Sequence, residues 1–103
     1  MKKRASRFLE EFQERAFVCD GAMGTVLYTK GIFINRCFEE LNLSMPSLVK
    51  EVHEAYVMAG SEILETNTFG ANAFRLASHG LGEKCREINR AGARLARQSG
   101  GDT

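Results

Sequence analysis

The sequence has few of the features that mark membrane or nucleic-acid-binding proteins. No apolar run among its 103 residues approaches the roughly 18 residues that a membrane-spanning helix needs. The formal net charge is only +1, and the basic residues are mixed with acidic ones rather than gathered in a stripe. Such a charge distribution exerts no strong attraction on a polyanion. The sequence therefore predicts neither a membrane nor a nucleic acid as a partner.

Cysteine is also scarce, and its pattern does not suggest a disulfide framework. The three cysteines form no CxxC pair and no even set, which is typical of a reducing compartment. The N-terminus is basic enough to open a signal peptide, but Glu10, Glu11 and Glu14 occupy the place of the apolar core that such a peptide needs. We therefore predict a cytoplasmic protein. The cysteines are Cys19, Cys37 and Cys85.

Apolar residues recur at helical spacing in several segments. The clearest stripe has a proline in its first turn and a glycine directly after its last apolar residue, and these two signals bound a helix over residues 46–59. The first segment, with Phe8, Leu9 and Phe12 on one face, predicts a helix over about residues 6–15. Shorter patterns predict helical stretches over about residues 26–30, 73–77 and 83–98.

Two brief apolar runs predict strands instead of helices. Residues 16–19 and 63–64 are apolar without a helical period, and each is followed by a polar segment that contains glycine. Short runs of this kind are typical of buried parallel strands. Residues 32–45 show no clear period and are predicted to be an irregular connection.

The order helix, strand, helix, strand, helix predicts an α/β fold with parallel strands joined by right-handed crossovers. Two parallel strands alone leave two open edges and cover too little of either sheet face. We therefore expect residues 1–103 to form one incomplete domain of about two strand–helix units, truncated before a third strand. The open edges predict that the isolated chain self-associates.

Functional groups are expected beyond the carboxyl ends of the two strands, since parallel α/β proteins carry their sites there. In the first polar segment, Gly21 and Gly24 free the backbone to present N–H groups to a carboxylate. Asp20 offers a negative charge to an ammonium group. Together these groups suit a zwitterionic amino acid. The alternative is that Asp20 and Gly21 only terminate a strand.

The second polar segment, residues 65–70, follows the second predicted strand. Neighbouring parallel strands lie about 4.8 Å apart, so both polar segments are expected to converge on one pocket edge. Alternate residues of an extended segment face opposite sides, so only some of residues 65–68 can face a common pocket. The alternative is a solvated loop in which Phe69 packs against protein rather than against a substrate.

Three stretches of the chain, residues 20–25, 36–42 and 53–72, resemble the start of homocysteine S-methyltransferase domains. The first reads DGAMGT, the second reads RCFEELN, and the third runs from HEAY to ETNTFGAN. The family includes cobalamin-dependent methionine synthase, betaine–homocysteine methyltransferase and a bifunctional homocysteine methyltransferase/methylenetetrahydrofolate reductase. On the second stretch, the bifunctional type is the most similar. The resemblance covers about residues 8–98.

The resemblance implies a (β/α)8 TIM barrel, of which this chain would be the N-terminal portion. It implies an enzyme that transfers a methyl group from a donor, not identified by the sequence, to the thiol of homocysteine to form methionine. In the full-length parent, zinc would bind this thiol and remove its proton, and FAD and folate would be present if a reductase module followed. The residues implied for homocysteine binding are Asp20, Gly21, Thr25, Glu65, Thr66, Asn67, Thr68 and Phe69.

The chain departs from the family in its metal ligands. The family's zinc-binding cysteines belong to a Gly-Asn-Cys-like motif and a paired-cysteine motif, and neither occurs in this sequence. Cys19 falls in a predicted strand and Cys85 on the apolar face of a predicted helix, so both are interpreted as small buried hydrophobes. We therefore predict no metal site and no catalytic residue in this chain, and no activity for the isolated chain.

Two alternative functions stay open at this point. The chain could be a non-catalytic truncated product with no independent activity. It could also be an α/β module that binds a phosphate or nucleotide at Gly21 and Gly24. The second alternative lacks the full GxGxxG spacing and any Walker lysine pattern.

Overall fold

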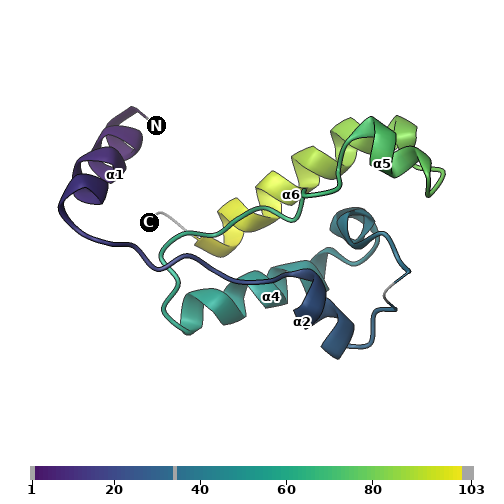
Figure 1. Ribbon diagram of the computed structural model, residues 1–103, viewed down its shortest axis with the longest axis horizontal. Coiled ribbons are helices and arrows are strands. Elements are labelled where there is room, and N and C mark those ends of the chain that lie inside the picture. The colour runs from purple at the N-terminus through teal and green to yellow at the C-terminus, as the bar shows by residue number, and fades with distance from the viewer. Residues whose placement is uncertain (1, 34, 101–103) are drawn as a thin grey trace.

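The computed structural model describes residues 2–33 and 35–100. Over this part, the chain forms α-helices and short 3-10 helices joined by extended connections (Figure 1). None of these helices, over the residues described, is both long and apolar enough to cross a membrane. In chain order the elements are α1 (Lys2–Glu14), α2 (Gly24–Thr29), η1 (Phe38–Glu40), α3 (Leu41–Ser44), α4 (Pro46–Met58), α5 (Ala73–Ala77), η2 (Gly82–Lys84) and α6 (Cys85–Gly100).

The predicted α/β fold is wrong for the described residues, which contain no strand and no sheet. The two predicted strands meet instead at one isolated parallel bridge between Cys19 and Ile63. The pairing does not extend toward the N-terminus, because the Val18 N–H donates to a Glu62 carboxylate oxygen at 3.1 Å rather than to a backbone carbonyl. Beyond the bridge, the first segment turns into α2. The strand–helix units expected of a TIM barrel are therefore not formed among the described residues, and self-association of the isolated chain stays a prediction.

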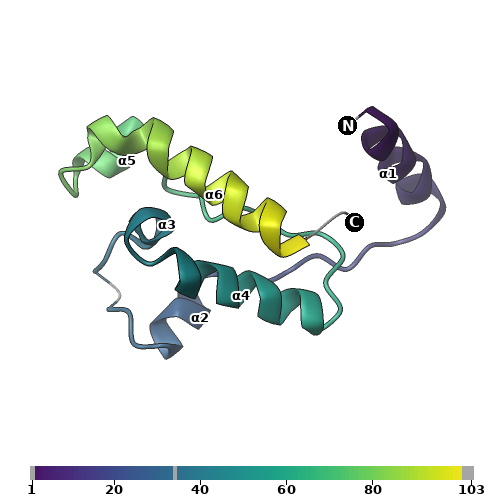
Figure 2. The ribbon, with the colours of Figure 1, turned by 180° about the vertical axis from the view of Figure 1, so that it is seen from behind.

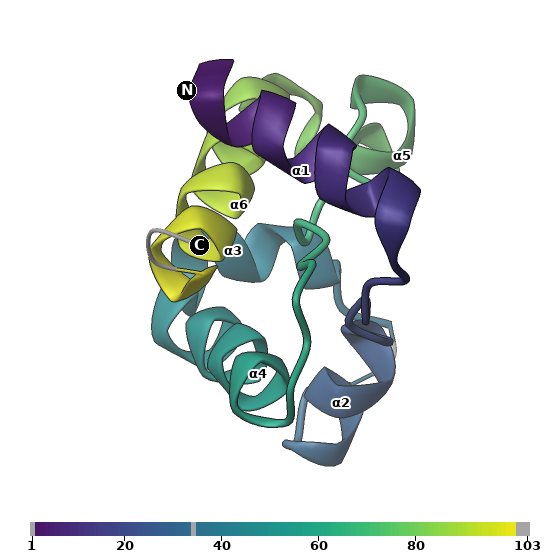
Figure 3. The same ribbon diagram turned by 90° about the vertical axis from the view of Figure 1, so that its left-hand side faces the viewer.

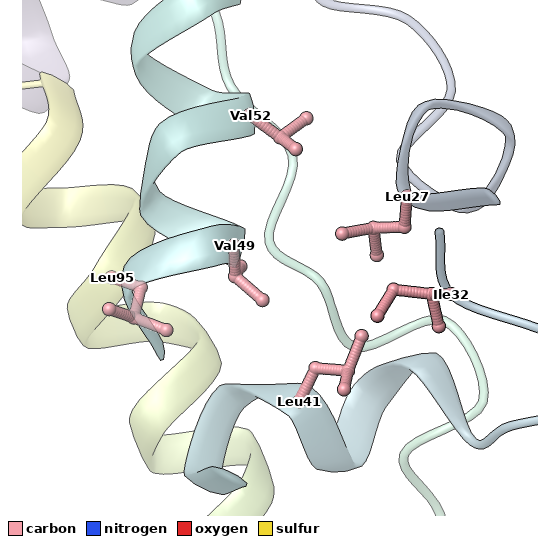
Figure 4. Packing of buried hydrophobic residues seen from close by; sticks show 6 residues of the cluster. All are labelled: Leu27, Ile32, Leu41, Val49, Val52 and Leu95. Carbon is pink, nitrogen blue, oxygen red and sulfur yellow. The ribbon is translucent and has the colours of Figure 1, made fainter. Parts of the chain in front are cut away.

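The two long helices α4 and α6 lie side by side at the centre of the molecule (Figures 1 and 2). α2 packs against α4, and α3 packs against both long helices. Figure 3 shows the extended connection from α4 to α5 running between α2 on one side and the two long helices on the other. The core that joins these elements (Figure 4) consists of Leu27, Ile32, Leu41, Val49, Val52 and Leu95.

α4, α5 and α6 confirm the helices predicted from apolar spacing. Gly60 follows α4 with a φ of +108°, a conformation that glycine adopts without the steric cost of a Cβ. The Asn72 side chain caps α5 by accepting a hydrogen bond from the Arg75 N–H at 2.8 Å. The irregular connection predicted over residues 32–45 is wrong in part, because η1 and α3 form there. Both are too short to show a helical period, but the fully buried Leu41 fixes α3 in the core.

A second, smaller apolar cluster holds α5 and η2 against α6. Its members Leu76 and Ile88 have no exposed surface, and Cys37 and Ala71 complete it. Burial of such side chains is the main stabilising contribution to a fold of this kind. Because Ala71 belongs to the cluster, the polar segment directly before it is anchored to the core.

α1 confirms the helix predicted near the N-terminus, and it stands apart from the other helices (Figures 1 and 2). The rings of Phe8 and Phe12 pack on Phe17, yet the two residues stay 40% and 58% exposed. Arg15 ties this end to the body through an ion pair with Glu62 at 2.8 Å. The Cα radius of gyration is 14.7 Å, larger than the about 13 Å of a compact chain of this length, because α1 extends away from the body.

Candidate functional site

Residues 20–24 and 65–69 line one cavity of about 310 Å³. We call residues 20–24 the first rim and residues 65–69 the second rim. The first rim leads into α2, and the second rim belongs to the connection from α4 to α5. The remaining lining residue, Glu39, comes from η1. Three segments that are distant in sequence therefore meet at this cavity.

Asp20 joins the two rims. Its N–H donates to the Ile63 carbonyl at 2.9 Å. One of its carboxylate oxygens accepts the Glu65 N–H at 3.1 Å. These two bonds hold the half-buried Asp20 carboxylate at the cavity wall, close to the Glu65 carboxylate.

The Cys19 thiol lies next to both of these carboxylates. Its Sγ is 3.6 Å from an oxygen of Asp20 and 3.6 Å from an oxygen of Glu65. Desolvation raises the pKa of the thiol, and the hydrogen bonds to the two carboxylates raise it further, because all of them favour the neutral form. The thiol is therefore protonated at neutral pH. Cys19 is exposed, so the prediction that it is a small buried hydrophobe is wrong.

Glu39 is a third carboxylate of the cavity, and the spacing of polar residues did not predict it. One oxygen accepts the Gly70 N–H at 3.1 Å, and the other accepts the Cys37 thiol at 3.6 Å. A Cβ at Gly70 would lie 3.3 Å from the carboxylate oxygens, so glycine permits this close approach. Glu39 falls within residues 36–42, and this resemblance was the signal that could have identified it.

The first rim rests on the Tyr56 side chain of α4. The Tyr56 hydroxyl donates to the Ala22 carbonyl at 2.7 Å. A Cβ at Gly21 would lie 3.0 Å from the Tyr56 hydroxyl oxygen. A Cβ at Gly24 would lie 3.1 Å from the Phe38 ring. Glycine at both positions therefore lets neighbouring side chains pack on the rim backbone, while its predicted role in presenting N–H groups to a carboxylate stays a prediction.

The second rim is tied to α3 through two buried amides. Asn67 is 5% exposed and Asn42 is 2% exposed. The Asn67 side-chain amide donates to the Phe38 carbonyl at 2.9 Å and to the Asn42 side-chain oxygen at 3.0 Å. On either side of Asn67, the hydroxyls of Thr66 and Thr68 lie 2.6 Å apart. The inward-facing amide thus alternates with two hydroxyl-bearing residues of the cavity lining.

Three carboxylates, those of Asp20, Glu39 and Glu65, line the cavity, and its described lining contains no basic side chain. None of the ion pairs between described residues includes any of the three. A cavity lined by one sign of charge concentrates ions of the opposite sign. Its chemistry therefore suits an ammonium group or another cation, and it repels a phosphate.

The cavity brings together seven of the eight residues predicted to bind a ligand. The exception is Thr25, which lies in α2 outside the lining and is exposed. Phe69 is 93% exposed, so it does not pack in the core. A ligand-binding role for each of these residues stays a prediction. The seven are Asp20, Gly21, Glu65, Thr66, Asn67, Thr68 and Phe69.

Cys19, Asp20 and Glu65 are also the described residues whose donor atoms come close enough to share a metal ion, within 4.8 Å of one another. This donor set contains two carboxylates, one thiol and no imidazole. Zinc sites in proteins are built mainly from thiolate sulfur and imidazole nitrogen. The set therefore does not fit the zinc that the family resemblance implies.

His53 of α4 is fully buried, and neither of its ring nitrogens has a hydrogen-bond partner among the described residues. Burial lowers the pKa of this imidazole below its ordinary value of 6.5, and the Asp20 carboxylate opposes that shift in part. The ring is therefore neutral at pH 7. A buried polar group without a partner costs about 1–3 kcal/mol, so His53 lowers the free energy of unfolding.

The sequence model of the homocysteine S-methyltransferase family matches residues 17–103. Methionine synthase of Mycobacterium leprae (strain TN) is 34% identical over 96 residues, which cover 87% of this chain and 8% of the relative. Methionine synthase of Mycobacterium tuberculosis (strain ATCC 25618 / H37Rv) is 32% identical over 96 residues, with the same coverage of both chains. The chain thus spans 8% of the length of these relatives.

Proposed function

The chain belongs to the homocysteine S-methyltransferase family, and we propose that its acidic cavity binds the amino-acid end of homocysteine within an enzyme that methylates the homocysteine thiol. The carboxylates of Asp20 and Glu65 take the ammonium group of this substrate. Thr66 and Thr68 line the same cavity, and their hydroxyls supply neutral hydrogen-bonding groups.

One observation carries this proposal: three carboxylates without an ion-pair partner among the described residues share one cavity. Carboxylates that share one cavity repel one another and attract a cation. An ammonium group compensates their charge and also donates hydrogen bonds to them. The same three carboxylates disfavour the alternative function, phosphate or nucleotide binding, because they repel an anion.

The reaction proposed for the whole enzyme is a methyl transfer to sulfur. The homocysteine sulfur forms a bond to the methyl carbon, the bond between this carbon and the donor breaks, and the thiol loses its proton, so that methionine forms. Within this chain the proposed contribution is binding and orientation of the amino-acid end. Zinc in the parent protein stays a prediction, and the proposed role of this chain does not depend on it.

Three finer assignments also stay predictions. The two mycobacterial relatives are methionine synthases, so the closer resemblance to the bifunctional methyltransferase/reductase, with its FAD and folate, stays a prediction. The methyl donor is not assigned. The isolated chain is predicted to be inactive in methyl transfer, since neither of the family's zinc-binding cysteine motifs occurs in it.

Isothermal titration of the 103-residue chain with L-homocysteine tests the proposal. The Asp20→Asn variant keeps the size of the side chain but removes its charge, and we expect about tenfold weaker binding or more, the effect of losing one charge-assisted hydrogen bond. Glu54→Gln, an exposed charge change on α4 outside the cavity, is the matched control and leaves the affinity unchanged.

The ligand itself supplies a second arm of the same experiment. 4-Sulfanylbutanoic acid has the thiol and the carboxylate of homocysteine but lacks its ammonium group. We expect no measurable binding of this analogue to the wild-type chain. Equal affinity for the two ligands, or unchanged homocysteine affinity in Asp20→Asn, would show that the carboxylates do not hold an ammonium group.

A further inference from the structure

Asn67 lines the cavity, but its side chain is directed away from any ligand. Both hydrogens of its amide are already donated to protein, to the Phe38 carbonyl at 2.9 Å and to the Asn42 side-chain oxygen at 3.0 Å. The residue is only 5% exposed. Its contribution to a ligand therefore comes from where it places its neighbours Thr66 and Thr68.

Asn42 of α3 is the partner that holds Asn67. Its side-chain oxygen accepts from Asn67, and its side-chain amide donates back to the Asn67 backbone carbonyl at 2.9 Å. Its second amide hydrogen goes to the Ile88 carbonyl of α6 at 3.1 Å. With 2% exposure, Asn42 uses both amide hydrogens and its oxygen to link the second rim to a central helix.

α6 approaches this pair closely because position 92 is a glycine. A Cβ at Gly92 would lie 2.7 Å from the Thr68 methyl carbon and 2.8 Å from the Asn42 amide nitrogen. Cβ atoms essentially never approach other heavy atoms this closely. The helix, the amide pair and the cavity-lining Thr68 are therefore packed as one unit.

We propose that Asn42 is a positioning residue for the cavity: its side-chain amide fixes the Asn67 peptide, and thereby sets the Thr66 and Thr68 hydroxyls at the ligand. The role in ligand binding rests on the proposed function. The structural role, fixing the second rim, does not depend on the identity of the ligand. Nothing in the side chain of Asn42 itself touches the cavity.

The reciprocal hydrogen bonds predict a particular energetic signature. If Asn42 is shortened, the Asn67 amide keeps one unpaired hydrogen in a buried position, and an unpaired buried donor is costly. If both are shortened, this unpaired Asn67 hydrogen is no longer present, so the double variant does not carry that cost. The effects of the two changes on ligand affinity are therefore not additive, and a double-mutant cycle isolates their coupling.

The test uses the full chain with Asn42→Ala, Asn67→Ala and the double variant. Asn89→Ala is the matched control, because the half-buried Asn89 amide also donates to two backbone carbonyls, those of Ala71 and Cys85, but lies outside the cavity lining. We expect Asn42→Ala to weaken homocysteine binding about tenfold, as for loss of a buried hydrogen-bond pair. The loss in the double variant is smaller than the sum of the two single losses, because the bond between the two side chains is counted in both, and Asn89→Ala binds like the wild type.

Amide hydrogen exchange of the unliganded chain provides a readout independent of homocysteine. The Thr68 N–H, bonded to the Thr66 carbonyl at 2.9 Å, and the Gly70 N–H, bonded to Glu39, exchange faster in Asn42→Ala but not in Asn89→Ala. Should Asn42→Ala fail to fold, Asn42→Ser replaces it, since serine leaves a smaller void than alanine and lacks the amide that donates both hydrogen bonds.

The two readouts separate the possible failures. A wild-type chain that binds no homocysteine overturns the proposed function, and exchange at Thr68 and Gly70 then decides the structural role of Asn42 by itself. A wild-type chain that binds, with Asn42→Ala matching Asn89→Ala in both affinity and exchange, overturns the positioning role. Additive losses in the double-mutant cycle overturn it as well, since they would show that Asn42 does not act through Asn67.

Discussion

The first rim and the second rim line the same cavity, but they are held in place differently. The first rim is fixed from outside by the Tyr56 hydroxyl and by the single bridge at Cys19. The second rim is fixed from within by two buried side-chain amides and by the Glu39 carboxylate. The first rim carries the Asp20 carboxylate on a segment held by hydrogen bonds between exposed groups, whereas the second rim carries the Thr66 and Thr68 hydroxyls on a segment anchored by the buried Asn67 amide.

This difference indicates how substitutions in each rim should affect ligand binding. Changes in the first rim should act mainly through charge, because Asp20 interacts with a cation over a longer range than a hydrogen bond. Changes beneath the second rim should act mainly through geometry, because hydrogen bonds to Thr66 and Thr68 weaken within fractions of an ångström. Single substitutions in or beneath each rim can test this difference separately.

Gly92→Ala should have the largest effect on stability. The new Cβ would collide with Thr68 and Asn42, at 2.7 and 2.8 Å, and overpacking of this kind costs about 1–3 kcal/mol. Alanine gains about 1 kcal/mol of helix propensity over glycine, so the net loss of stability is at most about 2 kcal/mol. Urea unfolding measures this loss of stability, and amide exchange should rise more at the second rim than at the first.

Arg94→Ala on the exposed face of the same helix is the control for Gly92→Ala. We expect its unfolding free energy to stay within about 0.5 kcal/mol of the wild type, as for most surface substitutions. A Gly92→Ala variant more stable than the wild type would mean that helix propensity outweighs packing. The second rim would then not depend on the close approach of α6.

The long helices could be predicted from the sequence better than the elements whose formation depends on distant parts of the chain. The apolar stripe of residues 46–59 and the glycine after it predict α4 nearly to its ends, because helical periodicity is a local property. The predicted strands at residues 16–19 and 63–64 are wrong because a strand depends on a neighbour, and one bridge is all that the described segments form. α3, four residues long, was missed because its formation depends on burial of Leu41.

In the candidate site, too, features of the local sequence were predicted and contacts between distant residues were missed. The polar segments after residues 19 and 64 were expected to converge, and they line one cavity although no sheet brings them together. Glu39 and Asn42 were missed as site residues because their roles arise from contacts with residues 67 and 70, far along the chain. Periodicity carries no information on such contacts, whereas the family resemblance covers both positions.

Tyr56→Phe should have a smaller effect, and one confined to the first rim. It removes the hydrogen bond to the Ala22 carbonyl while keeping the ring, so we expect a loss of about 1 kcal/mol. Tyr28→Phe is the matched control, since Tyr28 is 58% exposed and its hydroxyl takes part in none of the described hydrogen bonds. Urea unfolding and amide exchange should show a loosened first rim with an unchanged second rim. Equal loosening of both rims would contradict the proposed difference between them.

The smallest effect at neutral pH concerns His53, whose buried imidazole is uncharged there. Burial places the pKa of the folded-state ring below the ordinary value of 6.5, with the Asp20 carboxylate partly opposing this. The unfolded chain therefore binds the proton more tightly than the folded chain, and stability falls as the pH drops below about 6.5. Above that value His53 is neutral in both states, and its contribution to the pH dependence of stability vanishes.

Urea unfolding between pH 7.5 and pH 5 should show the decline in stability in the wild type and in His79→Gln, an exposed control. His53→Leu should show a weaker decline. Asp20→Asn should steepen the decline, because the carboxylate that partly compensates the charged imidazole is gone. The first rim would then be linked to the core through electrostatics rather than through packing. An unaltered pH profile in His53→Leu would contradict that link.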